Sequence, residues 1–584
     1  MTPLRKPEAN HPRPATRGSW LFPAWLQDYQ RAWLRPDVIA GLTAAAVVIP
    51  QAMAYATIAE LPVQVGLYTA FLPMAIYAWF GTSRALSFST TATVAILTGE
   101  ALDKLAPPGD TATFLIALPA LTLLVGVILV LAALLRLGFI ANFLSAPVLT
   151  GFKAGIALVI VCKQIPSLLG IHIAKGSFLH NLAAVWTKIP ETSITTLAVG
   201  ALTIGLVVAM MRLWPRVPAP LIAVIAGIAA VHLFALQAHG VATIGHIPRG
   251  LPTLTFPDPV FLADLWPAAL AIALMSFTET AAVGRAFVAD DEPAPMVNRE
   301  LFATGAANAG GALLGAMPAG GGTTQTTVNR LAGARTQLAE WVTATIALGT
   351  MLLLAPLIGD IPQATLAGVV IVVATALIRP AEFRAIGQIR RMELLWALTA
   401  TVGVVLLGTL RGILVAVCVS LLGLAYQESD PPLYVLKRKP GTNVFRPVSP
   451  IHLQDESFPG LLLLRTEGRI FFANAEHLTQ KAHALISEAD PRIVVLDMSG
   501  VFDVEYTALK MLVGAEKRVR DNGRILCLTG LNPGVLALVR RSPLGAALGH
   551  DRILLDLEQA VARYQGTTGG EERQTSEPGK SDSV

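Results

Sequence analysis

Long apolar runs separated by short polar stretches make up most of the chain as far as Gln427. Runs of this length and hydrophobicity predict a polytopic α-helical membrane protein. The predicted elements are 38–60, 64–80, 85–104, 112–135, 145–166, 192–211 and 217–237, then 264–287, 296–316, 317–334, 337–358, 363–378, 391–408 and 411–427. These fourteen elements divide into seven and seven, and an even number puts both termini on the same side.

Basic residues are distributed unequally between the two sets of loops. The loops on the side of the termini carry Arg84, Arg136, Arg212, Arg216, Arg285, Arg299, Arg330, Arg335, Arg379, Arg384, Arg390 and Arg391. The opposite loops carry Lys104, Lys163, Lys175, Lys188, Arg249 and Arg411. Because basic loops stay on the cytoplasmic side, both termini are predicted to be cytoplasmic, in the cell (inner) membrane.

The tenth element is too rich in Gly, Thr and Gln for an ordinary membrane helix. Its sequence from 317 to 329 is MPAGGGTTQTTVN. The three glycines favour extended backbone, and Thr323 or Thr324 could cap a short helix that follows. An extended stretch of roughly 20 Å and a helix of roughly 12 Å together span about one hydrocarbon thickness. Open backbone at this depth has to be buried or to line a cavity, which predicts a binding site.

The third element has the same design in the corresponding position of the first half. Residues 85–100, ALSFSTTATVAILTGE, place a Ser/Thr-rich stretch before a helix too short to cross alone. The helix N-termini, near Thr90 and Thr323, would point at each other across the midplane and favour an anion between them. Paired interruptions of this kind indicate an inverted repeat. The alternative is a single kinked helix packed by small residues.

Two further elements place polar groups at the same depth. Pro50 frees a backbone carbonyl in the first element, and Gln51 adds an amide beside it. Glu279 lies in the eighth element, the repeat partner of the first, about 20 Å from Trp266. An intramembrane carboxylate indicates function, here as a proton carrier or a ligand of a coupling Na⁺. The alternative is an internal ion pair with Arg285.

The composition excludes most other classes of protein. Of 584 residues, 53% are hydrophobic and 14% charged, which is unlike a soluble enzyme. The net charge of +5 comes from Lys and Arg residues that lie mostly at the ends of apolar segments, as is typical of membrane proteins. It does not indicate nucleic acid binding. No metalloprotease, phosphate-loop or dinucleotide motif occurs, and neither the cysteines nor the histidines have metal-ligand spacing. We therefore expect no catalytic residues, no metal and no cofactor beyond a coupling ion.

The composition changes after Gln427. Residues 428–448 read as a polar linker, and the rest alternates short strands with helices, as in a small α/β domain. The predicted strands are 461–465, 469–473, 493–496 and 525–528, and the predicted helices are 475–488, 506–521 and 533–541. The predicted domains are an N-terminal cytoplasmic segment 1–36, a transport domain 37–428, a linker and soluble domain 429–564, and a disordered tail 565–584.

Several blocks, taken together and in order, resemble the sulfate permease (SulP) family of anion transporters with a C-terminal STAS domain. The blocks in the membrane part are DVIAGLTAAAVVIPQAMAYATIAELPVQVGLYTAF at 37–71, GTSRALS at 81–87, NRELFATGAAN at 298–308 and VNRLAGARTQLAEWVTA at 328–344. In the soluble part, FFANAEHL at 471–478 and VVLDMSGVFDVEYTAL at 494–509 are similar to STAS core motifs. The resemblance covers nearly the whole chain.

The resemblance implies a core domain of elements one to four and eight to eleven that moves against a gate domain of the other six. It also implies a homodimer and an anion held between the half-helices of elements three and ten. The substrate-binding residues predicted from the half-helices and from the resemblance are Gln51, Tyr55, Ser89, Thr90, Thr91, Gly322, Thr323, Thr324 and Gln325.

The chain departs from the family pattern at two places in this site. Ser89-Thr90 stands where many members have Gly-Pro, and Thr324-Gln325 stands where many have Ser-Arg. Loss of that arginine removes a fixed positive charge. Sulfate, bicarbonate and a small carboxylate or dicarboxylate therefore all stay open as substrates, with a coupled cation supplying the missing charge.

The STAS part departs as well. Related bacterial regulators have Asp-Ser-Ser-Gly where this chain has Glu505-Tyr506-Thr507-Ala508, so Thr507 falls at the phosphorylatable position. The alternative is an ordinary helix N-terminus with a packed threonine. A cytoplasmic regulatory partner is possible through this domain.

The predicted function is secondary active transport of a small anion, coupled to H⁺ or Na⁺, by alternating access. The alternatives are an anion exchanger or channel-like member, and a membrane anion sensor that signals through its STAS domain.

Overall fold

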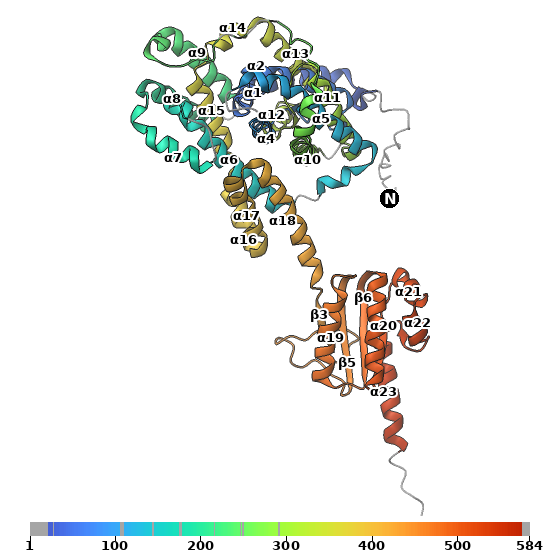
Figure 1. Cartoon of the computed structure of the whole chain (residues 1–584). Helices are drawn as coiled ribbons and strands as arrows, with labels where there is room; N and C mark the ends of the chain where they lie inside the picture. Colours follow the sequence, from blue (N-terminus) through green and yellow to red (C-terminus); the bar gives the residue numbers. More distant parts are fainter. Residues whose placement is uncertain are drawn as a thin grey trace, which may run out of the picture. The chain divides into compact units, whose positions relative to one another are not determined.

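The computed structural model describes residues 22–574 apart from 27–28, 106–109, 143–144, 174–177, 215–216, 246, 248–249 and 290–291 (Figure 1). The first 21 residues of the predicted cytoplasmic segment and the last ten of the predicted tail lie outside this range. The chain separates into two units, one ending at Ser420 and the other beginning at Leu421.

The first unit is helical, and its elements fall into two halves that each contain a two-residue strand followed by a short helix; the last helix, α18, continues past Ser420. The first half comprises α1 (Leu34–Ile58), α2 (Val63–Thr69), α3 (Leu72–Phe80), β1 (Phe88–Ser89), α4 (Ala92–Leu102), α5 (Thr111–Leu134), α6 (Ala146–Leu169), α7 (Phe178–Lys188), α8 (Ile194–Leu213) and α9 (Ala219–Phe234). The second half comprises α10 (Leu262–Ala286), α11 (Val297–Ala312), β2 (Gly320–Gly321), α12 (Thr323–Leu331), α13 (Leu338–Leu353), α14 (Ala355–Gly359), α15 (Gln363–Thr375), α16 (Pro380–Ile389), α17 (Arg391–Leu407) and α18 (Thr409–Ser429). Short 3₁₀ turns occur at Ala24–Leu26, Arg31–Trp33, Leu137–Asn142, Ile189–Glu191, Leu236–His239 and Pro259–Phe261.

Helix length and composition agree with a membrane protein. Within the described residues, seven helical spans are long and apolar enough to cross a membrane, and three shorter apolar helices accompany them. Two of the shorter three are α4 and α13. The brevity of α4 follows from the extended residues before it, as expected for the third element.

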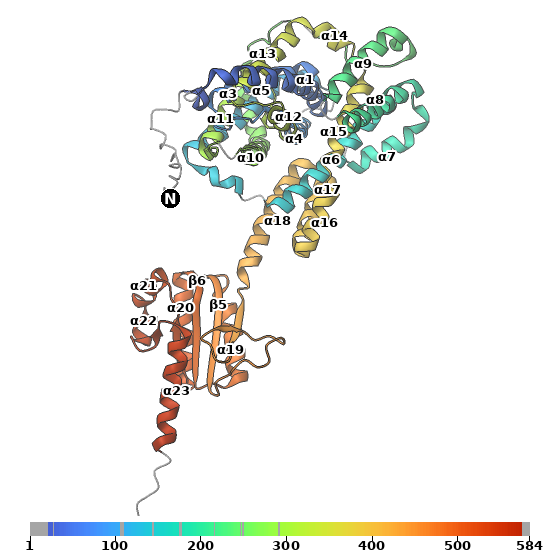
Figure 2. The ribbon, with the colours of Figure 1, turned by 180° about the vertical axis from the view of Figure 1, so that it is seen from behind.

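The helices of the two halves intermix and form two packing groups, which we call the core group and the gate group. In the core group, α1 packs on α13, α5 packs on α11, and α10 packs on α4 and α5. In the gate group, α6 packs on α15 and α17, and α8 packs on α9 and α15. Both views of the ribbon show α7, α8, α9 and α15 gathered on one side of α1, α5, α10 and α11 (Figure 1 and Figure 2). Contacts of α1 with α9 and α15, and of α4 with α6, join the groups.

Small residues permit the close helix contacts inside the core group. A Cβ atom on Gly126 of α5 would lie 2.5 Å from the backbone nitrogen of Ala309 in α11. Only glycine allows the two backbones to approach so closely, which is the usual means of packing helices in a membrane.

Several element predictions need correction. The stretch 64–80 is two helices, α2 and α3, and 337–358 is likewise divided into α13 and α14. Helices α7 and α16 were not predicted. Both are short: α7 buries Asn181 and Val185, and α16 buries none of its residues. Neither has the long apolar run by which membrane helices are recognised in a sequence.

The second unit contains a six-stranded sheet in the order β4-β3-β5-β6-β7-β8. Its elements are β3 (Leu433–Arg438), β4 (Phe445–Pro447), β5 (Leu461–Ile470), α19 (Ala475–Ala489), β6 (Ile493–Val504), α20 (Tyr506–Asp521), β7 (Ile525–Thr529), α21 (Pro533–Arg540), α22 (Pro543–Leu548), β8 (Ile553–Leu554) and α23 (Leu557–Gln574). Strands β5 to β8 are parallel, and β3 pairs antiparallel with both β4 and β5.

Both faces of this sheet are covered, and the alternation in β5 shows how. Leu462 and Leu464 contribute to the core beneath α19 and α20, whereas Leu461 and Leu463 contribute to the core beneath α23. Alternate residues of a strand point to opposite faces, so one apolar run supplies both cores.

Three predictions for the soluble part were wrong in detail. The proposed linker 428–448 contains β3 and β4, which complete the sheet. The strands predicted at 461–465 and 469–473 form one strand, β5, whose pairing with β6 continues through two register shifts. The disordered tail was predicted from residue 565, but α23 continues to Gln574. Packing of its first turns, through Leu557, Val561 and Tyr564, nucleates the helix, and extending a helix costs much less than starting one.

Candidate anion-binding site

The two broken elements meet in a short antiparallel ladder. Phe88 and Ser89 of β1 pair with Gly321 and Gly320 of β2. The N–H group of Gly322 also donates a hydrogen bond of 3.0 Å to the carbonyl of Ser87. Helix α4 begins three residues after β1, and α12 begins two residues after β2. The ladder thus brings the N-termini of the two short helices together, in agreement with the predicted pair of interruptions.

Side chains of α10 and α11 fix the glycine-rich strand of this ladder. The hydroxyl of Thr280 accepts a hydrogen bond of 2.8 Å from the N–H of Gly321. Asn308 accepts a bond from the Ala319 N–H at 2.8 Å and donates to its carbonyl at 3.1 Å. Ser276 donates to the same carbonyl at 2.6 Å. These bonds satisfy open backbone that a lipid environment could not.

A cavity of about 570 Å³ lies against both helix N-termini. Nine of the ten membrane residues predicted for substrate or coupling-ion binding line it: Gln51, Tyr55, Thr90, Thr91, Glu279, Gly322, Thr323, Thr324 and Gln325. Ser89 is the exception, since it is buried in the ladder and is not part of the lining. The structure therefore places the predicted residues at one site, and their role as ligands stays a prediction.

Buried polar groups in and beside this cavity lack partners. Within the described residues, the side-chain oxygens of Gln51, Thr90 and Gln325 make no hydrogen bond, and neither does that of Ser89. Gln51 and Gln325 are each 2% exposed, and Thr90 is fully buried. Buried polar groups are almost always paired in proteins, so unpaired ones at a cavity point to a polar ligand. The orientation of each glutamine amide is assigned, and either end can face that ligand.

Glu279 links α10, the eighth predicted element, to α4, which belongs to the third. Its carboxylate is 7% exposed and accepts a hydrogen bond of 2.7 Å from the hydroxyl of Thr91, the N-cap residue of α4. For the described residues, the partner of the Glu279 carboxylate is Thr91, in place of the ion pair with Arg285 that was the alternative. Arg285 lies six residues later on α10, about 120° around the helix, and its side chain is exposed.

The structure adds charged residues that the sequence interpretation missed. Lys153 of α6, Glu382 of α16 and Arg379, the N-cap residue of α16, line the same cavity. Glu382 accepts a hydrogen bond from Thr150 at 3.1 Å and one from Arg379 at 2.8 Å. Lys153 lies seven residues after the start of α6, inside an apolar segment. A lysine at this depth is itself a signal of function, and could have been singled out for that reason.

Glu340 and Glu300 are buried carboxylates that hold the broken elements in place. Glu340 accepts hydrogen bonds from the hydroxyl of Ser87 and the N–H of Phe88, both at 3.2 Å, and from the Asn329 amide at 3.3 Å. It therefore contacts both β1 and α12. Glu300 accepts bonds from the Tyr77 hydroxyl and from the backbone N–H groups of Thr82 and Ser83. Both lie in sequence blocks noted above, and their position in apolar segments was the signal that sequence reasoning overlooked.

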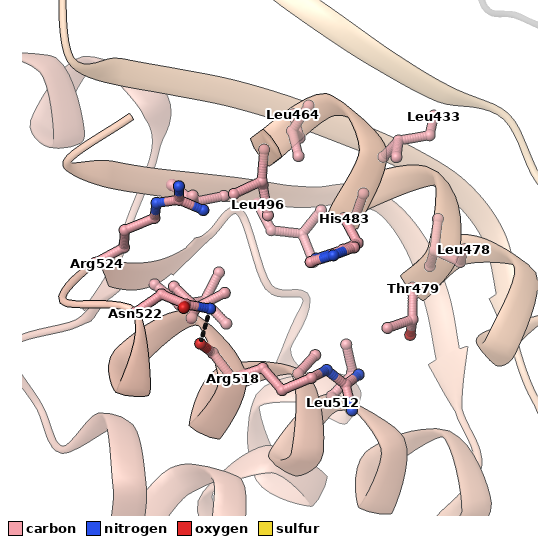
Figure 3. Close-up of a pocket in the computed structure, with 16 residues that line it drawn as sticks. Leu433, Leu464, Leu478, Thr479, His483, Leu496, Leu512, Arg518, Asn522 and Arg524 are labelled. Carbon is pink, nitrogen blue, oxygen red and sulfur yellow. Dashed lines mark hydrogen bonds between the residues drawn. The ribbon is translucent and has the colours of Figure 1, made fainter. Parts of the chain in front are cut away.

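The soluble unit has a pocket of its own between α19 and α20 (Figure 3). Apolar side chains such as Leu464, Leu496 and Leu512 form most of the lining, together with His483, Arg518 and Arg524. The side-chain amide of Asn522 donates a hydrogen bond of 2.8 Å to the carbonyl of Arg518. The cavity volume is only about 70 Å³. That is room for about two water molecules, so the pocket is too small for a sizeable ligand.

Thr507 lies in the first turn of α20, after the N-cap residue Glu505. The helix N-terminus of the alternative is therefore present, but its packed threonine is wrong, because the side chain is exposed. The Glu505 carboxylate accepts a hydrogen bond from the N–H of Phe472 at 3.0 Å. Phosphorylation of Thr507 stays a prediction.

The fold and the cavity define a class: an integral membrane transport protein with a C-terminal α/β domain. Residues 34–400 match the model of the sulfate permease family, and residues 452–560 match the STAS domain model. The chain belongs to the sulfate permease family. The probable sulfate transporter Rv1739c of Mycobacterium tuberculosis is 35% identical over 546 residues, covering 92% of this chain and 97% of the relative. The probable sulfate transporter 3.3 of Arabidopsis thaliana is 30% identical, covering 96% and 93%.

Solved structures agree on the fold. Murine Slc26a9, an anion transporter determined in the inward-facing state, matches with a TM-score of 0.86 at 21% identity, covering 96% of this chain and 97% of that one. The transmembrane domain of BicA, a cyanobacterial bicarbonate transporter, matches with a TM-score of 0.58 at 23% identity, covering 66% and 98%. The Slc26a9 match confirms the fold, a helical membrane domain followed by a soluble α/β domain, and the family model identifies the latter as a STAS domain.

Proposed function

We propose that this protein is a secondary active transporter of a small anion, coupled to H⁺ or Na⁺, that works by alternating access between the core and gate groups of helices. The observation that carries the proposal is the cavity between the paired N-termini of α4 and α12, with Glu279 on its wall. Helix N-termini and unpaired hydroxyl and amide groups favour an anion, whereas the carboxylate favours a cation or a proton.

The substrate class follows from the charges around the cavity. Gln325 supplies no positive charge, but Lys153 and Arg379 of the gate group do, and Glu279 and Glu382 offset them. An anion is therefore accommodated best when Glu279 is protonated or paired with Na⁺, which couples the two movements. Sulfate is the leading substrate, because the relatives at 35% and 30% identity are named as probable sulfate transporters. Bicarbonate and dicarboxylates are the other members of the class to be tested.

Membrane orientation and assembly complete the proposal. The basic residues counted in the loops favour cytoplasmic termini, in the inner membrane. This orientation puts the STAS domain in the cytoplasm, where it can meet regulatory partners. A homodimer is expected from the family resemblance.

The direct test is uptake into liposomes of sulfate, bicarbonate, chloride and dicarboxylates, with H⁺ and Na⁺ gradients imposed separately. Accumulation of one anion against its gradient under one cation gradient is the expected result. Binding without accumulation under every gradient would contradict transport and favour a sensor.

Glu279→Gln tests the coupling. The substitution removes the negative charge and keeps the shape, so the Thr91 hydroxyl still has an acceptor. We expect anion binding and folding to persist. Gradient-driven accumulation should fall about tenfold or more, leaving anion exchange, because the amide carries no transferable proton and offers no charge to a cation. The matched control is Glu191→Gln, because the Glu191 side chain is 63% exposed and lies in the 3₁₀ turn Ile189–Glu191. Wild-type accumulation by Glu279→Gln would show that the carboxylate has a structural role only.

A further inference from the structure

A second polar cavity, of about 440 Å³, lies at the other end of the helices that form the binding cavity. Its lining includes Glu60, Asp103 and Lys163. The ammonium group of Lys163 is 3.6 Å from the carboxylate of Glu60 and 3.8 Å from that of Asp103. The side chains of Lys163 and Glu60 are only 19% and 10% exposed. We refer to Glu60, Asp103 and Lys163 as the ion cluster.

Three helices lead from the binding cavity to the ion cluster over similar distances. On α1, Gln51 lines the binding cavity and Glu60 follows nine residues later. On α4, Thr93 lines that cavity and Asp103 is the C-cap residue, ten residues later. On α6, ten residues separate Lys153 from Lys163. The helical part of each interval corresponds to roughly 10 to 15 Å, and the two ion pairs show that the three charged groups lie at one level.

The two ends of the binding cavity differ in their access to solvent. The lining of the binding cavity includes Arg379 and Glu382, whose side chains are 61% and 42% exposed. Toward the ion cluster, Ile58 and Ala59 of α1 and Val159 and Ile160 of α6 belong to one buried apolar cluster. The binding cavity is thus open at the end of Arg379 and closed at the end of Lys163.

The ion cluster joins the two groups of helices that have to separate. Glu60 and Asp103 belong to the ends of α1 and α4 in the core group, and Lys163 belongs to α6 in the gate group. Glu60 adopts a left-handed backbone conformation, with φ of 62°, which L residues other than glycine, asparagine and aspartate rarely adopt. Such a conformation persists only where surrounding contacts favour it, and the bond to Lys163 is one such contact.

From this geometry we infer that Lys163, by pairing with Glu60 and Asp103, closes one end of the anion pathway and stabilises the conformation seen here. The inference rests on the proposed alternating access. When the gate group moves away from the core group, both ion pairs break, and the second cavity becomes continuous with the binding cavity. Lys163 then presents its charge to an anion entering from that end. In the predicted topology this end is the extracellular one.

The test measures accessibility rather than transport, so it remains informative whatever anion is carried. Cys162, Cys418 and Cys527 are replaced by alanine, and a single reporter cysteine is introduced in the full-length protein in nanodiscs. One reporter is Leu149→Cys, which lines the binding cavity, and the other is Ile171→Cys, which lines the second cavity and is 6% exposed. The probe is a membrane-impermeant maleimide, and the rate of labelling is measured.

Lys163→Gln is expected to slow labelling of Leu149→Cys and to accelerate labelling of Ile171→Cys. Each rate should change by roughly two- to tenfold, the range expected for the loss of two weak, partly buried ion pairs. Lys163→Arg, which keeps the charge, should leave both rates close to those of the parent protein. The matched control is Lys188→Gln, because Lys188 pairs with Glu191 at the same distance of 3.6 Å but within the gate group alone.

Two results would overturn the inference. Unchanged labelling at both reporters would show that the ion cluster does not hold this conformation. A rise at both reporters would show that Lys163→Gln merely loosens the fold. If the two rates shift in opposite directions but no anion accumulates in liposomes, the inferred role of the ion cluster is supported and the proposed coupled transport is contradicted.

Discussion

At the residue scale, Gln325 and Lys153 line the same cavity, one from the core group and one from the gate group. Gln325 is buried at the start of α12 and carries an unpaired amide oxygen, whereas Lys153 approaches the cavity from the gate group. A charge on α12 would stay with the core group throughout a transport cycle. A charge on α6 belongs to the gate group, so under the proposed alternating access its distance from the anion would change as the two groups move. The electrostatics of the site would then depend on conformation.

Gln325→Arg should therefore weaken the dependence of transport on the coupling cation and favour anion exchange. Two unit charges about 4 Å apart interact by about 4 kcal/mol at an intermediate dielectric, enough to replace the contribution of a bound cation. The measurement is anion uptake with and without the H⁺ or Na⁺ gradient. Gln388→Arg, on the exposed surface of α16, serves as the control. If the variant keeps the original cation dependence and anion ranking, the side chain of Gln325 does not act on the anion.

At the element scale, the β1–β2 ladder couples the two halves of the inverted repeat. Only two residues of each strand pair, and isolated strands of this length have no stability of their own. The ladder is stabilised by side chains of α10, α11 and α13. Thr280, Asn308 and Glu340 accept hydrogen bonds from backbone N–H groups in the ladder or next to it. The helix N-termini at the cavity are therefore positioned by helices distant in the sequence.

Gly321→Val tests this dependence. A Cβ atom at position 321 would lie 3.0 Å from the Cα of Thr280 and 3.0 Å from Leu86, so β2 has to shift away from α10. Overpacking of this kind costs about 1–3 kcal/mol, and we expect a lower melting temperature and a loss of anion affinity of about tenfold or more. Gly349→Val in α13 is the control, since nothing lies within 4 Å of its added Cβ. Unchanged affinity in a folded Gly321→Val protein would show that the ladder does not position the site.

At the scale of the whole molecule, the binding cavity and the second cavity lie entirely within the first unit, before Ser420. The STAS unit has its own sheet and its own two cores. Nothing in the proposed pathway requires its residues.

Truncation after residue 430 should accordingly leave a membrane-inserted protein that still binds the anion, while turnover or expression falls. Binding and uptake are compared between the truncated and full-length proteins, with size-exclusion chromatography as the check on folding. Complete loss of binding by a well-folded truncated protein would contradict this separation of roles.

The sequence by itself determined the fold class, the two broken elements, and Gln51 and Glu279 as residues of the cavity wall. It could do so because burying open backbone or a carboxylate in a membrane is costly, so each such feature is visible in a single apolar segment. The same reasoning applied to Lys153, Glu300 and Glu340 would have found them too.

The tertiary structure alone decided the contacts between segments far apart in the chain. The pairing of β1 with β2, the bonds from Ser87 and Phe88 to Glu340, and the ion cluster each join residues about 60 to 250 positions apart. Local composition carries no record of such partners. The structure also decided which pairing was wrong, since the turn of α10 directs Glu279 toward Thr91 and away from Arg285. Proximity in sequence suggested the arginine, whereas helix geometry placed it on another face.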